Sequence, residues 1–228
     1  MNNIEQPLIL SIDTSGDICS VSISSKNSFF LHYSINVKRY HDKLLAEITR
    51  RAMNDLEIDI SSIDAIAISS GPGSFTGLRI GASFAKALCI DESPKLIAVP
   101  TLFAYSVAAE EVSNLLGIKK IHSLITANSG IVYHQLFDNN SNELSKPEML
   151  KIDDIIENIK TNKDNYRADF FVGNAVNSMS NINVLQYSEL NSMDALKTSA
   201  AGWRLYNQAL FVDSLTFEPQ YIQDVITK

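Results

Sequence analysis

The sequence predicts an α/β protein with two lobes that are built on one plan. Each half of the chain opens with short runs of alternating apolar residues and then passes into segments with helical apolar spacing. The chain has 228 residues, and this length suits two lobes of roughly 100 residues each. We expect a first lobe over 1–102 and a smaller, more divergent second lobe over 103–228, whose end packs back on the first.

The first lobe is expected to begin with three strands. One apolar run ends at Asp13, turn-forming residues follow at 14–17, and the next run alternates apolar with polar residues. The period then changes, because Leu44, Leu45 and Ile48 share one face of an amphipathic helix. A strand, a helix and a strand in a right-handed crossover complete the lobe. The expected strands are 8–13, 19–24, 29–37, 65–70 and 96–99, and the expected helices are 41–56 and 74–90.

The second lobe is expected to start with a helix that leads into another hairpin. Turn residues at 128–130, Asn-Ser-Gly, separate two apolar runs. Beyond the hairpin the pattern predicts helices, short strands and an extended tail. The expected helices are 101–116, 152–160 and 193–212, and the expected strands are 121–127, 131–137, 169–172, a short one near Val184 and a final extended piece at 216–222.

The composition is that of an ordinary globular protein, with 45% hydrophobic and 20% charged residues. A formal net charge of −7 opposes a phosphate backbone, so another chain is expected to hold most of any RNA partner. Cys19 and Cys89 lack the spacing of a redox or zinc site and are expected to be reduced thiols. No apolar run approaches the roughly 18 residues of a spanning helix. We therefore expect a cytoplasmic protein without a membrane partner.

Two turns could contact a nucleotide or another anion. Asp13 and Thr14 end the first strand, where an acid and a hydroxyl could meet a metal-bound phosphate; they could equally bond the turn's own amides. Gly73 and Ser74 open a helix whose free amides could bind an anion, with Arg79 one turn further along. A P-loop is excluded, because no Gly-Lys-Ser/Thr follows the second glycine.

The helix after this second turn has small residues at Gly77, Gly81 and Ala85, four apart in one row. Each glycine inside a helix costs about 0.5 to 1 kcal/mol relative to alanine, so the row needs a reason such as close packing. The pattern alone leaves two readings open, packing within the lobe and contact with a helix of a partner.

The histidines do not suggest a metal cluster. His41 begins a predicted helix, while His32, His122 and His134 occur singly in strand-like segments. The sequence also lacks a GxSxG nucleophile elbow and an ordered triad. We expect no catalytic residue and no metal.

Several ordered blocks of the sequence form a recognisable set. The most specific is DAIAISSGPGSFTGLRIG at 64–81. It is accompanied by LSIDTSGDICSVSI at 10–23, by His41 with Leu44-Leu45, and by VPTL at 99–102. Together these resemble the TsaB family, the companion subunit in bacterial synthesis of threonylcarbamoyladenosine in tRNA. The second half is similar through shorter blocks, namely Val132-Tyr133, FVGN at 171–174, FEP at 217–219 and Tyr221-Ile222.

The resemblance implies an actin-like fold of the sugar kinase and chaperone ATPase class, with a mixed sheet flanked by helices in each lobe. It implies a non-catalytic subunit that dimerises with and activates the catalytic paralogue TsaD, while a TsaE-type ATPase docks on the pair. ATP is then used by the complex and no cofactor is bound by this chain alone. The tRNA is contacted only indirectly, and a homodimer is a further possibility.

In the family the subunits join through the first two helices of each, which favours the partner reading of the small-residue row. The implied interface residues are His41, Leu44, Leu45, Ile48, Phe75, Gly77, Leu78, Gly81 and Ala85. One departure is that Thr126-Ala127-Asn128 stands where the family usually has Asp-Ala-Arg. Two alternatives stay open, namely a glycoprotease-like or ATP-hydrolysing actin-like enzyme and a structural homodimer.

Overall fold

The computed structural model describes residues 6–222, apart from 27, 38–39, 90–92, 163–168 and 180–181. The contacts divide the chain into two units. The first contains the chain up to Thr101 together with Asp194–Pro219, and the second contains Leu102–Met193. The first unit thus combines the first part of the chain with a segment from near its end.

The first unit is built on a five-stranded mixed sheet with the order β3-β2-β1-β4-β5. The first three strands are antiparallel neighbours, and β1, β4 and β5 run parallel. The predicted strands are all present, within one or two residues of their expected ends. Their bounds are β1 Ile9–Asp13, β2 Ile18–Ser25, β3 Ser28–Asn36, β4 Ala65–Gly71 and β5 Lys95–Pro100.

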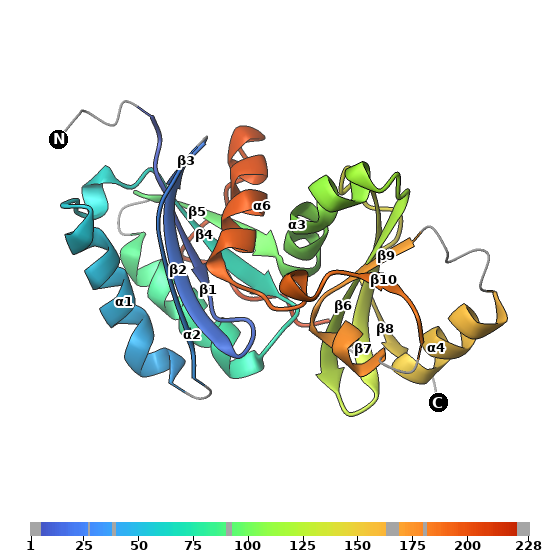
Figure 1. Cartoon of the computed structure of the whole chain (residues 1–228). Helices are drawn as coiled ribbons and strands as arrows, with labels where there is room; N and C mark the ends of the chain where they lie inside the picture. The colour runs from blue at the N-terminus through green and yellow to red at the C-terminus, as the bar shows by residue number, and fades with distance from the viewer. Residues whose placement is uncertain are drawn as a thin grey trace. The chain divides into compact units, whose positions relative to one another are not determined.

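Helices cover both faces of this sheet. Figure 1 shows α1 (His41–Asp55) and α2 (Phe75–Leu88) on one side of it and α6 (Ala195–Asn207) on the other. Because β4–α2–β5 joins parallel neighbours, it forms the predicted crossover. The expected end of the second helix at Ile90 lies outside the described residues.

The two faces of the first sheet differ in chemistry, because side chains alternate along each strand. The face under α1 and α2 is apolar and shares one core with Leu45, Ile48 and Ala52. The face under α6 carries small hydroxyl residues that are fully buried. These are Ser11 on β1, Ser20, Ser22 and Ser24 on β2, and Ser69 on β4.

The second unit repeats the plan of the first. Its sheet has the order β10-β9-β6-β7-β8, with β6, β7 and β8 as antiparallel neighbours and β9 and β10 added in parallel. Read from β8, this is the order of the first sheet, so the twofold plan and the actin-like fold are confirmed. The strands are β6 Lys120–Asn128, β7 Ile131–Asp138, β8 Glu148–Lys151, β9 Asp169–Val172 and β10 Leu185–Gln186.

Two helices pack on this second sheet. On one face α4 (Ile152–Thr161) lies over a cluster that includes Leu124 and Phe171. On the other face α3 (Thr101–Leu115) brings Phe103 to Phe137, with ring centroids 6.4 Å apart. Short 3-10 segments at Asn174–Met179 and Ser188–Leu190 complete the unit.

The structure corrects three predictions of elements. Strand β8 was not expected, since its residues Glu-Met-Leu-Lys carry no strand signal. Helix α6 ends at Asn207 rather than at 212, and Ala209 beyond it has φ 54°. The tail at 216–222 forms no strand; instead Val212 makes a single antiparallel bridge to Leu96. Among the helices of the described residues, none is long and apolar enough to cross a bilayer.

Candidate functional site

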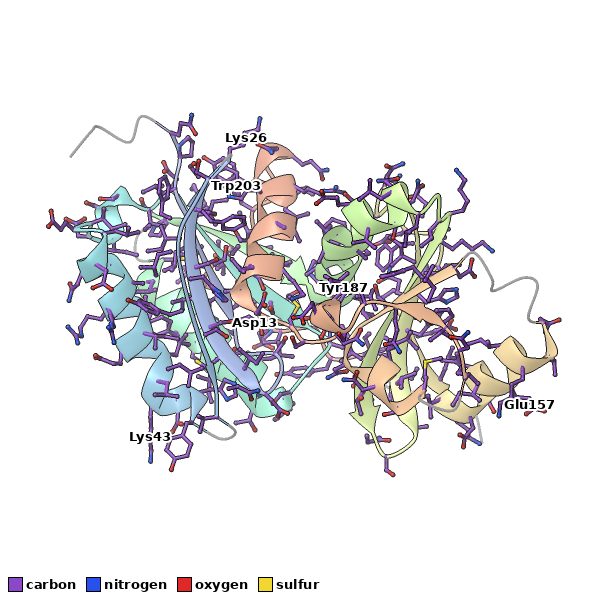
Figure 2. The ribbon with its side chains drawn as sticks, viewed as in Figure 1. Asp13, Lys26, Lys43, Glu157, Tyr187 and Trp203 are labelled. Carbon is purple, nitrogen blue, oxygen red and sulfur yellow. The ribbon has the colours of Figure 1, made fainter. Side chains whose placement is uncertain are left out.

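The first candidate site is the end of β1, where Asp13 is fully buried. Its carboxylate accepts hydrogen bonds from the hydroxyl of Ser69 and from both the amide and the hydroxyl of Ser15, the latter two at 3.2 Å and 3.1 Å. The hydroxyl of Thr198 on α6 lies 3.4 Å from the same carboxylate. Burial raises the pKa of Asp13 to about 6, although the bonds from Ser69 and Ser15 lower it. Figure 2 shows Asp13 near the beginning of α6. The acid is thus bonded by its own chain.

The turn after β1 and the turn before α2 lock together through their backbones. The Ser74 amide donates to the Ser15 carbonyl at 2.7 Å, and the Thr14 hydroxyl donates to the Gly77 carbonyl at 2.8 Å. A Cβ added to Gly73 would lie 2.6 Å from the Ser15 carbonyl oxygen, so only glycine allows this approach. Gly71 has φ 110°, which also favours glycine.

The Ser74 amide, which an anion at this helix start could otherwise bond, is thus already engaged by Ser15. Ser74 caps α2 as predicted, because its hydroxyl accepts from the Gly77 amide at 3.2 Å. Thr14 is buried, whereas Arg79 is exposed, with its guanidinium 4.1 Å from the centre of the Phe75 ring. The reading in which Asp13 bonds its own turn therefore fits the geometry better than an open phosphate site.

The small-residue row on α2 lies inside the first unit. An added Cβ would lie 1.9 Å from the Thr14 carbonyl oxygen at Gly77, and 2.4 Å from the Thr14 hydroxyl oxygen at Gly81. Ala85 is fully buried in the core under the sheet. The prediction that α2 exposes this row is wrong, because the close packing that the glycines allow is with the turn after β1.

Most other residues of the implied interface are also core residues. His41, Leu45, Ile48 and Leu78 are buried, since they face the sheet. Leu44 is half-buried, while Phe75 keeps 53% of its surface exposed. Of the nine residues, only Leu44 and Phe75 offer a partner appreciable surface in this structure.

Sequence reasoning missed Tyr40, which lies directly before α1 and is 47% exposed. Lys43 lies over its ring, with the ammonium nitrogen 5.1 Å from the ring centre. Figure 2 shows Lys43 at the beginning of α1, pointing outward. Tyr40 and Phe75 thus give the starts of both helices an exposed aromatic ring beside a cation, and we call Tyr40, Lys43, Phe75 and Arg79 the aromatic–cation patch. The sequence feature that could have indicated this exposed ring is an aromatic residue directly before a predicted helix.

The histidines of the second unit are not isolated in space. His122 and His134 are far apart in the sequence but lie on adjacent strands, with ring nitrogens 3.0 Å apart. Within the described residues, no group of three His, Cys, Asp or Glu side chains could hold a metal ion.

Solved structures share the fold along nearly the whole chain. YeaZ from Pseudomonas aeruginosa is 20% identical, with a TM-score of 0.74 over 95% of this chain and 100% of that one. A second structure, described as similar to peptidase YEAZ from Pseudomonas aeruginosa, is 22% identical with a TM-score of 0.76 over the same shares. At such identities the likeness concerns the fold.

Curated relatives settle the family. The tRNA threonylcarbamoyladenosine biosynthesis protein TsaB of Buchnera aphidicola subsp. Baizongia pistaciae is 30% identical over 66% of this chain and 69% of its own. The chain belongs to the TsaB family. TsaB of Escherichia coli strain K12 is 28% identical over 59% of this chain and 56% of its own.

The chain is similar to the transferase as well. The family model described as TsaD, tRNA N6-adenosine threonylcarbamoyltransferase, matches residues 35–201. The transferase of Thermococcus sibiricus is 32% identical, but over only 35% of this chain and 24% of its own. The TsaB likeness is therefore the more extensive one.

The departure from the TsaB pattern at 126–128 lies at the end of β6. Pairing with β7 is irregular between Thr126 and Asn128, and the Thr126 amide donates to the Asn174 side chain at 2.8 Å. Asn174 belongs to the FVGN block, so the segment that departs from the TsaB pattern is bonded to a block that matches it.

Proposed function

We propose that this chain is the non-catalytic subunit that dimerises with and activates a TsaD-type subunit in tRNA N6-threonylcarbamoyladenosine biosynthesis. The observation that carries the proposal is the extent of the likeness. The chain matches 69% and 71% of the length of two TsaB relatives, but 24% and 21% of two transferases. The chain therefore corresponds to the TsaB subunit rather than to the transferase.

The outer sides of α1 and α2 are the surface that best suits a TsaD-type subunit. The aromatic–cation patch lies at the starts of these helices, and Ile80 and Phe84 on α2 are only partly buried. Aromatic and arginine side chains are typical anchors of protein interfaces. The buried faces of both helices hold the core, so a partner contacts the opposite sides.

The sealed end of β1 supports a non-catalytic role. The Asp13 carboxylate is occupied by hydroxyl donors of the same unit, and the Ser74 amide is bonded to Ser15. In this proposal ATP and tRNA are handled elsewhere in the complex, where a TsaE-type ATPase also docks. The chain itself contributes a binding surface.

The test is association of the purified chain with its cognate TsaD-type subunit, measured by calorimetry. Phe75→Glu and Tyr40→Glu place a charge in the patch and are expected to weaken binding roughly 30-fold or more, as loss of an interface anchor does. Phe29→Glu is the matched control, because Phe29 is 58% exposed on β3 and is paired with Ser24, whose side chain bonds Trp203 of α6. It should bind as the wild type does.

Three results would contradict the proposal. Unchanged binding of both patch variants, with folding verified by circular dichroism, would exclude this surface. Self-association that the TsaD-type subunit does not displace would favour the structural homodimer. Hydrolysis of ATP or of a glycoprotein by the isolated chain would favour the enzyme.

A further inference from the structure

Four ionisable side chains form a continuous row across the second sheet. Asp169 on β9, His122 on β6, His134 on β7 and Glu148 on β8 come from four consecutive strands in the sheet order. The distance from Asp169 Oδ2 to His122 Nε2 is 3.0 Å, from His122 Nδ1 to His134 Nε2 is 3.0 Å, and from His134 Nδ1 to Glu148 Oε1 is 3.3 Å. All four ring nitrogens thus take part in three contacts.

The row is shielded from water at one end and open at the other. Asp169, His122 and His134 are buried, and the ring of Phe171 stacks on His122 with centroids 4.5 Å apart. The Glu148 side chain is 51% exposed. Glu148 lies on β8, the last strand at that edge of the sheet, which continues directly into α4.

Other charged groups lie at the margins of the row. Lys120 shares the face of β6 with His122 by strand alternation and is exposed. The charged residues of α4 are on its exposed side, and they are Asp153, Asp154, Glu157 and Lys160. Within the described part of the chain, the carboxylates of Asp169 and Glu148 contact the imidazoles directly, at the two ends of the row.

The three contacts fix the number of protons on the two rings. An ionised carboxylate can only accept, so the ring nitrogens that face Asp169 and Glu148 must each carry a proton. The hydrogen bond between the two rings needs one further proton, carried by either His122 Nδ1 or His134 Nε2 but not by both. Three protons on four nitrogens make one imidazolium and one neutral imidazole. The geometry thus calls for one proton more than two neutral rings carry.

We propose that the row from Asp169 to Glu148 is a proton-binding site that controls whether β8 is held on the second sheet. The extra proton is shared between His122 and His134. When it leaves, two protons remain for three contacts, and one contact fails. The contact between His134 and Glu148 breaks first, because the exposed Glu148 side chain can turn to water. Strand β8 then loses the side-chain hydrogen bond that joins it to the buried end of the row.

A second extra proton is resisted. Burial and the neighbouring His122 lower the pKa of His134 to about 4, although Glu148 raises it. Two protonated nitrogens would then face each other between the rings, which disfavours the doubly charged pair. The pair is therefore built to hold one extra proton.

The test combines nitrogen NMR of the histidine rings with amide hydrogen exchange on the full chain across a pH series. In the state with β8 held, we expect three of the four nitrogens of His122 and His134 to carry protons. As the pH rises and the third proton leaves, protection of the β8 amides should fall about tenfold, the scale of one hydrogen bond. Protection of β6 and β9, corrected for intrinsic exchange, should stay constant.

Glu148→Gln is the decisive variant, because an amide can accept from a protonated His134 nitrogen or donate to an unprotonated one. It should make β8 protection independent of pH. Glu157→Gln removes the same charge from the exposed side of α4 and should keep the wild-type pH dependence. The proposal is overturned if the two rings titrate independently, if β8 protection ignores their titration, or if both variants behave alike.

Discussion

The carbonyl oxygen of Thr14 lies where a side chain on Gly77 would have to be, 1.9 Å from an added Cβ. The turn after β1 and the first turn of α2 therefore touch backbone to backbone. The block at 64–81, the most specific of the sequence, therefore contributes a close backbone contact to the packing of its own unit.

Gly77→Ala is expected to lower the free energy of unfolding by about 2 kcal/mol or more, because backbone must move to admit the methyl group. Better helix propensity returns at most about 1 kcal/mol. Chemical denaturation measures the change. Gly16→Ala is the control, since an added Cβ there meets nothing within 4 Å and should change stability by less than about 0.5 kcal/mol. Equal effects at both glycines would argue against this contact.

Ser24→Ala is expected to destabilise the chain more than Ser199→Ala. The Ser24 hydroxyl accepts from the Trp203 indole at 2.9 Å and bonds the Ser199 hydroxyl at 2.9 Å. Losing Ser24 leaves a buried indole N–H without its acceptor, which costs about 1–3 kcal/mol. Losing Ser199 keeps the indole bond intact. The reverse order in urea denaturation would contradict the assignment of Ser24 as the shared acceptor.

Asp13→Asn is expected to change how stability depends on pH. Because the folded pKa of Asp13 is about 6 and its ordinary value is 3.8, the folded chain binds this proton more tightly than the unfolded chain. The contribution of Asp13 to the free energy of unfolding therefore falls as pH rises from about 4 to 6, by up to about 3 kcal/mol. The asparagine variant, which keeps an oxygen acceptor, should lack this fall.

Denaturation of both proteins at pH 4 to 7 measures the difference. Asp17→Asn, at an exposed acid of the same turn, should retain the wild-type slope. A parallel pH profile for wild type and Asp13→Asn would mean that Asp13 does not titrate in this range.

Both cysteines are expected to be inert in the folded chain. Burial raises the pKa of Cys19 to about 12, with a contribution from the charge of Asp13, and that of Cys89 to about 11. Thiolate is the reactive form, so Ellman's reagent at pH 8 should label neither thiol until guanidinium unfolds the protein. Rapid labelling of the native chain would show that the core that holds both thiols opens readily.

The sequence predicts most elements because their signals are local. Alternating apolar and polar residues predict β2, apolar residues at helical spacing predict α1, and turn residues predict the hairpin of β6 and β7. Strand β8 has only four residues, so pairing with β7 rather than intrinsic preference makes it a strand. The chain therefore needs its tertiary structure to define that edge.

The candidate sites were harder to predict, because they depend on which side of an element faces the core. In the sequence, the row at Gly77 and Gly81 is equally consistent with an internal or an external neighbour, and only the position of Thr14 in the fold decides between them. The pairing of His122 with His134 depends on the register of β6 and β7, which places Leu124 opposite His134. Spacing along the chain carries no such information.

The hydroxyl-lined face of the first sheet has a consequence for synthesis of the chain. The sheet is complete at Pro100, but the helix that covers this face begins only at Ala195. Its first amide bonds Ser20, and its Thr198 lies against Asp13. While α6 is still inside the ribosome, the buried polar groups of this face, such as Ser20 and Asp13, are exposed to water. The first unit thus reaches its final form only after nearly all of the second unit has been translated.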